Sequence, residues 1–148
     1  MDFDLLQGIH EETRRKILAA AHEESHPAGA FLFRQGEPAR HFYILREGRV
    51  RLTVGEKGSL AYVISAPGEI LGWSTLAGNV TYTASMECRT AVKVLKIASA
   101  QLDEIFVADP VSGVLFFKHV ATLLGRRLIA SYQATLSVHG ERDPRPGG

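Results

Sequence analysis

The hydrophobic and polar positions along the chain change period several times, and each change predicts a different kind of element. In the first part of the chain Ile9, Ile17 and Leu18 recur at helical spacing, which predicts an amphipathic helix. Glu11 and Glu12 fall in the expected first turn of this helix, where the helix dipole favours negative charge. A helix is therefore expected before residue 22.

From Phe31 onward the pattern predicts β-structure. Val50, Leu52 and Val54 alternate with polar residues, as in a strand that buries one face. Short apolar runs separated by glycine-containing turns are typical of a sandwich or a barrel. The predicted strands are 31–33, 42–45, 50–54, 60–64, 82–87 and 92–97, with a hairpin turn at 55–58.

Two helices are predicted after the strands. Ser99 is expected to cap a short helix that ends near Phe106. Asp109 and Pro110 then give a helix start, because an N-cap residue is followed by proline at the first helical position. The helix that starts there is expected to cover residues 110–138, a length of about 42 Å.

The apolar surface of the helix 110–138 is too broad for one small domain to cover. We therefore expect this helix to pack against the same helix of a second chain and to form a homodimer. Gly125 either allows the helices to approach closely or has no such role. Arg126 and Arg127 are expected to form a solvated face rather than an anion site. The apolar positions are Val114, Phe117, Ala121, Leu124, Leu128 and Tyr132, with Phe116, Val120 and Leu123 beside them.

Composition narrows the class of protein. The 148 residues are 45% hydrophobic and 22% charged, which suits one folded domain. A net charge of +1 gives no long-range field that would attract the chain to nucleic acid or to an anionic membrane. No apolar stretch reaches the roughly 18 residues of a membrane span, and Cys88 is the single cysteine. We expect a cytoplasmic protein with no internal disulfide and with Cys88 as a buried, non-catalytic thiol.

The segment from His22 to His26 matches the metalloprotease pattern His-Glu-x-x-His. That chemistry needs both histidines one turn apart on a continuous helix, together with a third ligand. Pro27 disfavours helical geometry at His26. The match is interpreted as a coincidence, so no metal site and no catalytic residue is expected, and a metal hydrolase is a rejected alternative.

Two longer runs, Gly29–Ala39 and Phe42–Val50, resemble the cyclic-nucleotide-binding domain family, which includes the catabolite activator protein and the regulatory subunits of cAMP-dependent protein kinase. Gly36 and Gly48 fall in these runs at expected tight turns, where a positive φ costs least for glycine. The resemblance implies an α+β, mainly β fold: a jelly-roll-like β-roll with N-terminal helices and a long C-terminal helix.

The resemblance also implies a domain organisation. Residues 1–140 would form one cyclic-nucleotide-binding-like domain that includes the dimerisation helix 110–138. Residues 141–148 are expected to form a disordered tail because they are rich in proline and glycine. In the bacterial transcription regulators of this family a helix-turn-helix domain follows the long helix. Too few residues remain after Val138 to hold two helices and a turn, so no direct contact with nucleic acid is expected.

The family carries a phosphate-binding cassette with a Gly-Glu pair, a short helix and then Arg-Ser/Thr-Ala. Its backbone N–H groups and its arginine meet the cyclic phosphate, and its glutamate accepts a hydrogen bond from the ribose hydroxyl. Here the glycine of that pair aligns either with Gly68, followed by Glu69, or with Gly72, followed by Trp73. The family has another glycine four residues before the pair, and the spacing to Thr83 also favours the alignment at Gly72.

With that alignment Trp73 replaces the glutamate and Tyr82 replaces the arginine. No arginine or lysine lies between Trp73 and Met86, so a buried phosphate would lack a cationic partner. Tight binding of cAMP or cGMP is therefore expected to be lost, and the two aromatic residues either stack on a planar ligand or fill the pocket. The predicted ligand-binding residues are Gly72, Trp73, Ser74, Thr75, Tyr82, Thr83 and Ala84.

These observations predict a non-enzymatic ligand-sensing or regulatory module with degenerate cyclic-nucleotide recognition. The alternative is a structural or interaction protein whose pocket is plugged and whose long helix binds a protein partner. The sequence does not identify the small molecule that would bind, and no membrane association is expected.

Overall fold

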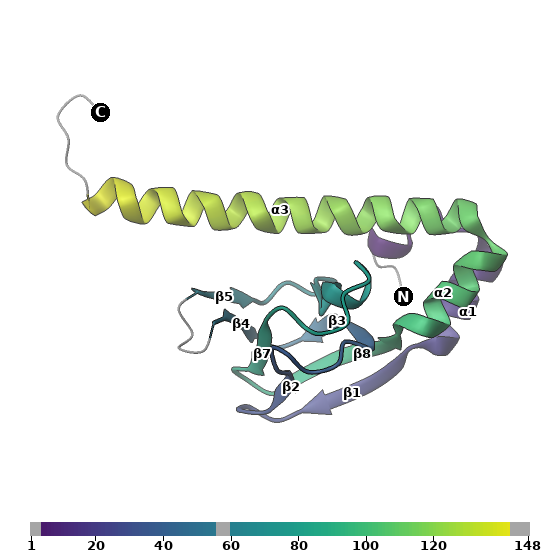
Figure 1. Ribbon diagram of the computed structural model, residues 1–148, viewed down its shortest axis with the longest axis horizontal. Helices are drawn as coiled ribbons and strands as arrows, with labels where there is room; N and C mark the ends of the chain where they lie inside the picture. Colours follow the sequence, from purple (N-terminus) through teal and green to yellow (C-terminus); the bar gives the residue numbers. More distant parts are fainter. Residues whose placement is uncertain (1–3, 56–59, 143–148) are drawn as a thin grey trace.

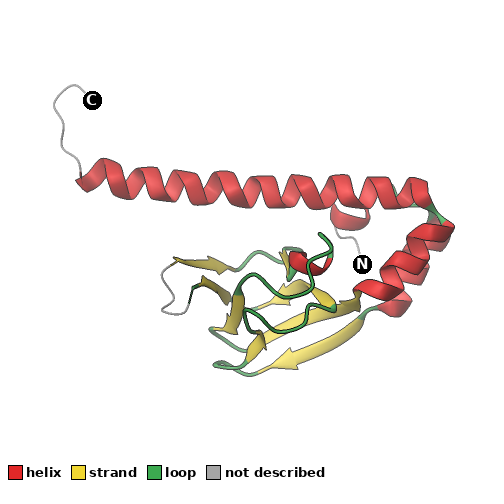
Figure 2. Ribbon diagram, viewed as in Figure 1, coloured by secondary structure: helices red, strands yellow, loops and turns green. Residues whose placement is uncertain are grey.

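The computed structural model describes residues 4–55 and 60–142, which fold into a β-roll with helices at one end and along one side (Figures 1 and 2). The helical elements are η1 (Asp4–Leu6), α1 (Glu11–Ala20), η2 (Trp73–Thr75), α2 (Ser99–Ala108) and α3 (Pro110–Arg142). The strands are β1 (His22–His26), β2 (Phe31–Phe33), β3 (His41–Glu47), β4 (Val50–Val54), β5 (Leu60–Ile64), β6 (Ile70–Leu71), β7 (Ser85–Cys88) and β8 (Val92–Ala98).

The strands form two antiparallel sheets that face each other. The first sheet has the order β1-β8-β3-β6 and the second has the order β2-β7-β4-β5. Apolar side chains from both sheets meet between them, and this interior is the core of the roll. It contains Phe33, Tyr43, Leu45, Val50, Ile64, Leu71, Tyr82, Met86, Cys88, Val92 and Val94.

The strand β3 of the first sheet is buried on both faces over most of its length, which explains its uninterrupted apolar run. Tyr43 and Leu45 point into the roll, whereas Phe42 and Ile44 point to the helices on the other side. The helices cover that side with η1, α2 and the first half of α3, and Phe42 meets Phe116 of α3 with ring centroids 6.1 Å apart. The sheet thus joins the roll to the helices.

Two strands lie outside the sequence prediction. β1 is made of His22–His26, which are polar, and it pairs with β8 along its whole length. β6 has only two residues and pairs with β3. Neither segment has an apolar alternation of useful length, so the pairing partner decides its conformation. The predicted strand 82–87 is also shorter in the structure, because β7 begins at Ser85.

The predicted helix starts are right at Asp109 and wrong at Ser99. The Ser112 N–H donates to Asp109 Oδ1 at 3.2 Å, as expected of an N-cap. Ser99 instead is the first residue of α2, and its hydroxyl donates to the Arg40 carbonyl at 3.2 Å. The long helix extends to Arg142, four residues beyond the predicted end. Most of the predicted hairpin turn and tail, residues 56–59 and 143–148, lie outside the described residues.

The α+β fold with a β-roll and a long C-terminal helix is confirmed, as are the positive φ values of Gly36 and Gly48. Cys88 is buried in the roll, and this burial raises the pKa of its thiol. No helix in the described ranges is both long and apolar enough to cross a membrane.

Candidate ligand site

The predicted cassette begins at a glycine whose conformation and surroundings both exclude a side chain. Gly72 follows β6 with a φ of 78° and a ψ of 37°, in the left-handed region. A Cβ at this position would lie 3.2 Å from Tyr82 Cε1 and 3.3 Å from both the His41 carbonyl oxygen and Phe33 Cε2. The chain then turns into η2. Gly68 lies in the turn before β6 and also has a positive φ, of 92°.

A pair of hydroxyl groups holds the two halves of the cassette together. Ser74 Oγ lies 3.0 Å from Thr83 Oγ1, and the Thr83 N–H donates to Ser74 Oγ at 3.3 Å. Ser74 is buried, so its hydroxyl requires such partners. The structure therefore brings together η2 and the segment before β7, which the sequence separates. Thr75 lies beside them with its Oγ1 buried and without a hydrogen-bond partner among the described residues.

Tyr82, at the predicted arginine position, fills the interior of the roll. Its side chain is 5% exposed and stacks on Phe33 with ring centroids 4.0 Å apart. Its hydroxyl donates to the His41 carbonyl oxygen at 2.6 Å. Burial raises the pKa of Tyr82, so the phenol stays neutral. Tyr82 thus occupies space and offers no charge to a ligand.

Trp73, at the predicted glutamate position, has a different environment. Its side chain is half-buried and packs against the core between the first sheet and the helices. The residue also borders a small cavity within the cassette. Trp73 therefore lies at the edge of the candidate site and is not enclosed in the roll.

The cassette cavity is very small. Its volume is about 10 Å³, which is room for about one water molecule, whereas ligand pockets typically measure several hundred Å³. Ligand entry at this site requires the walls to move. The cavity is lined by Phe33, Leu52, Gly72, Trp73, Ser74, Thr83, Ala84, Met86 and Arg127.

The prediction that Arg127 forms part of a solvated face on the long helix is wrong, because its side chain is mostly buried. Its side chain is 12% exposed, and its Nη2 donates to Glu69 Oε2 at 2.6 Å and to the Ile70 carbonyl oxygen at 2.5 Å. It is the one charged residue among the described residues that line the cavity. Sequence reasoning missed it because 58 residues separate Arg127 from Glu69. Only the path of α3 past β6 brings them together.

The His-Glu-x-x-His segment cannot hold one metal ion with both histidines. It forms β1, and a strand rises about 3.3 Å per residue, so His22 and His26 lie about 13 Å apart. In a zinc site each histidine nitrogen lies about 2 Å from the metal. His26 instead lies 3.2 Å from Glu24 through its Nε2.

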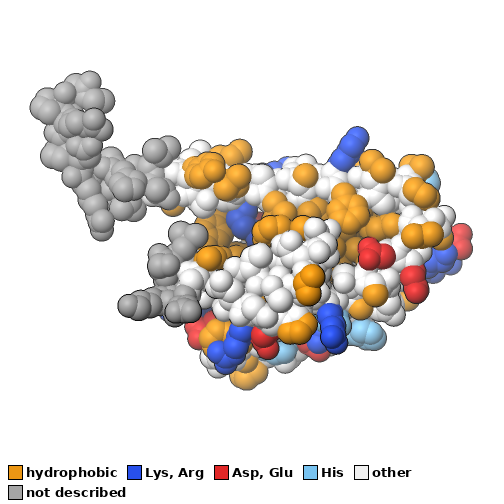
Figure 3. All heavy atoms as spheres, in the orientation of Figure 1, with side chains coloured by type: hydrophobic (Ala, Val, Ile, Leu, Met, Phe, Trp, Pro, Cys, Tyr) orange, Lys and Arg blue, Asp and Glu red, His pale blue; other side chains and the backbone are white. Residues whose placement is uncertain are grey.

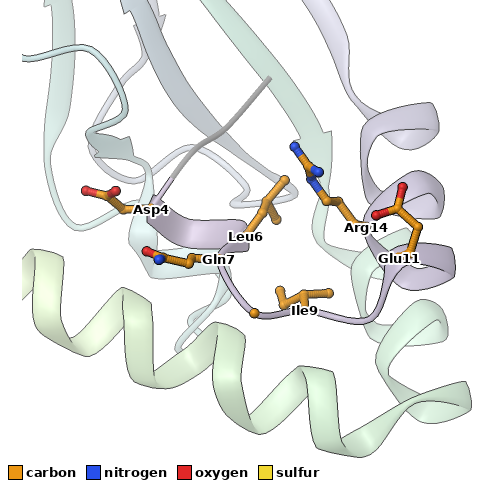
Figure 4. Close-up of a pocket in the computed structure, with 7 residues that line it drawn as sticks. Asp4, Leu6, Gln7, Ile9, Glu11 and Arg14 are labelled. Atoms are coloured by element: carbon orange, nitrogen blue, oxygen red, sulfur yellow. The ribbon is translucent and has the colours of Figure 1, made fainter.

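A larger hollow lies between η1 and α1, away from the cassette (Figure 4). Its volume is about 320 Å³, and Asp4, Glu11 and Arg14 are among its lining residues. It contains none of the predicted cassette residues. We therefore take the cassette as the candidate ligand site.

Comparison with known proteins gives one consistent result. The family model "Cyclic nucleotide-binding domain" matches residues 23–109. A cAMP-dependent protein kinase regulatory subunit from Colletotrichum orbiculare is 26% identical over 111 residues, which are 75% of this chain and 28% of that protein. The chain thus spans little more than a quarter of that curated relative.

Solved structures agree with the family match. A candidate cyclic nucleotide-binding protein from Geobacter metallireducens has a TM-score of 0.76 and 27% identity, with 85% of this chain and 92% of that chain covered. The catabolite activator protein of Thermus thermophilus has a TM-score of 0.67 at 23% identity, with 93% of this chain and 64% of that chain covered. The second likeness concerns the fold alone.

Proposed function

Because the chain belongs to the cyclic nucleotide-binding domain family, we propose that it is a non-enzymatic, cytoplasmic, ligand-sensing regulatory module. The ligand would be a small molecule received by the cassette between Gly72 and Ala84. The observation that carries this proposal is the pairing of Ser74 with Thr83 beside the Gly72 turn, next to a small cavity that all three residues line.

The same site supports degenerate recognition of cyclic nucleotides. Tyr82 stands where the family has arginine, and its hydroxyl is already bonded to His41. A cyclic phosphate at that position would lose its hydration without gaining a cation from the cassette segment. Arg127 lines the cavity from α3, whereas Tyr82 is not among the lining residues, and a phosphate would have to displace Glu69 to reach this guanidinium. We therefore propose that cAMP and cGMP bind weakly at most.

Isothermal titration of the full chain with cAMP and with cGMP tests the weak-binding part of the proposal. The expected result is no binding at micromolar concentrations, since the two family contacts to phosphate and ribose are replaced. Dissociation constants in the micromolar range or below would show that the cassette still recognises the family ligand. Native mass spectrometry of freshly purified protein tests the ligand-sensing part, because a retained small molecule would add a defined mass.

The long helix supports a proposed homodimer. Side chains on α3 are exposed although they are large and apolar, for example Val111 at 69% and Tyr132 at 59%. Exposed apolar surface of this kind marks an interaction site. A Cβ at Gly125 would meet nothing within 4 Å in this chain, which leaves room for a second helix. Up to Ala134, the other large exposed apolar residues of α3 are Val114, Phe117, Leu128 and Ile129.

A second candidate function is an interaction protein with a plugged pocket that acts through α3. The cavity of about 10 Å³ and the buried ring of Tyr82 favour it. The two candidates differ in whether small molecules alter Trp73, the only tryptophan of the chain. An interaction protein should retain no small molecule in native mass spectrometry, and its Trp73 fluorescence should be unaffected by candidate ligands.

A further inference from the structure

We propose that Arg127 is the anion receptor of the cassette and that Glu69 is its internal competitor. In this proposal, which rests on the ligand-sensing function above, a small organic anion takes the guanidinium from Glu69. The exchange changes how α3 is attached to the roll. The ligand would carry one carboxylate or phosphate group on an apolar body.

The position of Arg127 is the first reason. It extends from α3 to the start of β6, where it contacts Glu69 and Ile70, and it also lines the cassette cavity. A guanidinium in a mostly buried setting attracts an anion more strongly than a solvated one does. The cassette segment lacks a cation of its own, so the long helix supplies the one positive group at the site.

The second reason is that the bonding of Arg127 is incomplete. Both hydrogen bonds described above come from Nη2, and a single Glu69 oxygen receives one of them. Arg127 Nε is buried and has no hydrogen-bond partner among the described residues. An arginine can hold an anion through two parallel N–H groups at once. An anion that engages Nε as well as an Nη group would satisfy a donor that Glu69 leaves unpaired.

The walls of the cavity indicate the rest of the ligand. Phe33, Leu52 and Met86 are apolar and face the same small space as Trp73. The hydroxyls of Ser74 and Thr83 are already paired with each other. A ligand with an apolar body and one anionic end therefore matches these groups better than an anion that is charged throughout. Figure 3 shows that hydrophobic side chains also gather between the long helix and the roll.

Ligand binding would regulate the protein through the contact that Arg127 makes between α3 and the roll. Most side chains of residues 128–134 of α3 are exposed, so this segment has little core packing to hold it. Its exposed apolar face is the one proposed for the dimer. If the ligand anion and Glu69 compete for the same guanidinium, ligand binding and helix attachment become coupled equilibria, each of which shifts the other.

Fluorescence of Trp73 in the full chain provides the test. The probes are 3-phenylpropionate and phenyl phosphate, with the neutral 3-phenylpropanol as their uncharged counterpart. We expect both anions to change the fluorescence of the wild-type protein, and Arg127→Gln to weaken their binding by about tenfold or more. Glu69→Gln should strengthen binding several-fold, because it removes the competitor. Arg126→Gln is the matched control, since it makes the same change at an exposed neighbouring residue.

Two further variants separate binding from folding. Arg127→Lys keeps the charge but loses the two-pronged geometry, so its affinity should fall between those of the wild type and Arg127→Gln. The double variant Glu69→Gln with Arg127→Gln leaves no unpaired carboxylate, so it should fold and still bind poorly. Amide hydrogen exchange in α3 near Arg127 should change on addition of 3-phenylpropionate in the wild type but not in the double variant.

Three outcomes would overturn the inference. If both anions bind Arg127→Gln and Arg126→Gln with wild-type affinity, the cassette binds its ligand without Arg127. The proposed ligand-sensing function would then stand, and the proposed role of Arg127 would be wrong. If Glu69→Gln weakens binding, Glu69 is a partner of the ligand and not its competitor. If neither anion binds even to Glu69→Gln, the anion site is wrong, and a small molecule retained in native mass spectrometry would still support ligand sensing.

Discussion

At the scale of single residues, two separate constraints require glycine at position 72: its left-handed backbone conformation and the close packing around it. Its φ of 78° disfavours any side chain, and three groups crowd the space where a Cβ would be. Gly36 has a similar φ of 88° but has open space around it. The two glycines therefore allow backbone strain to be separated from crowding.

We expect Gly36→Ala to lower the free energy of unfolding by about 1 kcal/mol, the cost of a left-handed conformation for a residue with a side chain. Gly72→Ala should lower it more, because the new methyl group also presses on Tyr82 and Phe33. Urea denaturation of both variants measures the difference. Equal losses would show that the cassette can relax around an added methyl group.

Tyr82 gives a second prediction at this scale. Tyr82→Phe removes the hydroxyl that donates to the His41 carbonyl at 2.6 Å, while the ring can keep its stacking on Phe33. We expect a loss of about 1 kcal/mol in the free energy of unfolding, measured by urea denaturation. Tyr132→Phe is the matched control because Tyr132 is 59% exposed. A Tyr82→Phe variant as stable as the control would mean that the hydroxyl has no net stabilising effect.

At the scale of elements, the carboxylate of Asp109 connects α1 to the segment between α2 and α3 through hydrogen bonds. Asp109 accepts hydrogen bonds from the Ser112 N–H, the Thr13 hydroxyl and His10 Nδ1. The side-chain hydrogen bond from Ser112 contributes most, followed by those from Thr13 and His10, and with the Ser112 N–H they hold the pKa of Asp109 well below its ordinary value. A carboxyl whose pKa is lower in the folded state stabilises that state above its unfolded pKa, and the stabilisation is lost as the pH falls.

We therefore expect Asp109→Ala to lower the melting temperature at neutral pH. The gap to the wild type should narrow as the pH falls below about 4, where the aspartate of the unfolded chain takes up a proton. Thermal melts across the acidic range measure this gap. Asp103→Ala, at an exposed position of α2, is the control and should show no such narrowing. A gap that stays constant with pH would show that the charge of Asp109 is not what matters.

The success of the sequence prediction also varies by element. The run in β3 and the Asp109-Pro110 start of α3 were predictable, because apolar periodicity and capping are local signals. β1 was not, because His22–His26 are polar and become a strand only by pairing with β8. Within the site, the Gly72 turn was predictable from spacing. The role of Arg127 was not, since it depends on where α3 crosses the roll.

At the scale of the whole molecule, the exposed apolar face of α3 predicts association in solution. Leu128→Glu places a charge on this face and should convert the proposed dimer to a monomer, because burying an unpaired carboxylate is strongly unfavourable. Multi-angle light scattering on the full chain gives the mass directly. Gln133→Glu adds the same group at an exposed polar position of α3 and should leave the dimer intact. A monomeric wild-type protein at micromolar concentration would contradict the dimer.

The polarity of β1 affects how the molecule behaves among many copies of itself. β1 lies at the rim of the first sheet, and within the described ranges only β8 pairs with it. An edge strand has unpaired backbone N–H and C=O groups, so a strand of another chain can pair with it, which is a route to aggregation. Glu23 and Glu24 line this rim, with Arg46 and Lys96 each 3.7 Å from one of them. The charged residues Glu23 and Glu24 make β1 hard to predict as a strand from the sequence. They also disfavour the pairing of β1 with the edge strand of another copy, which favours solubility.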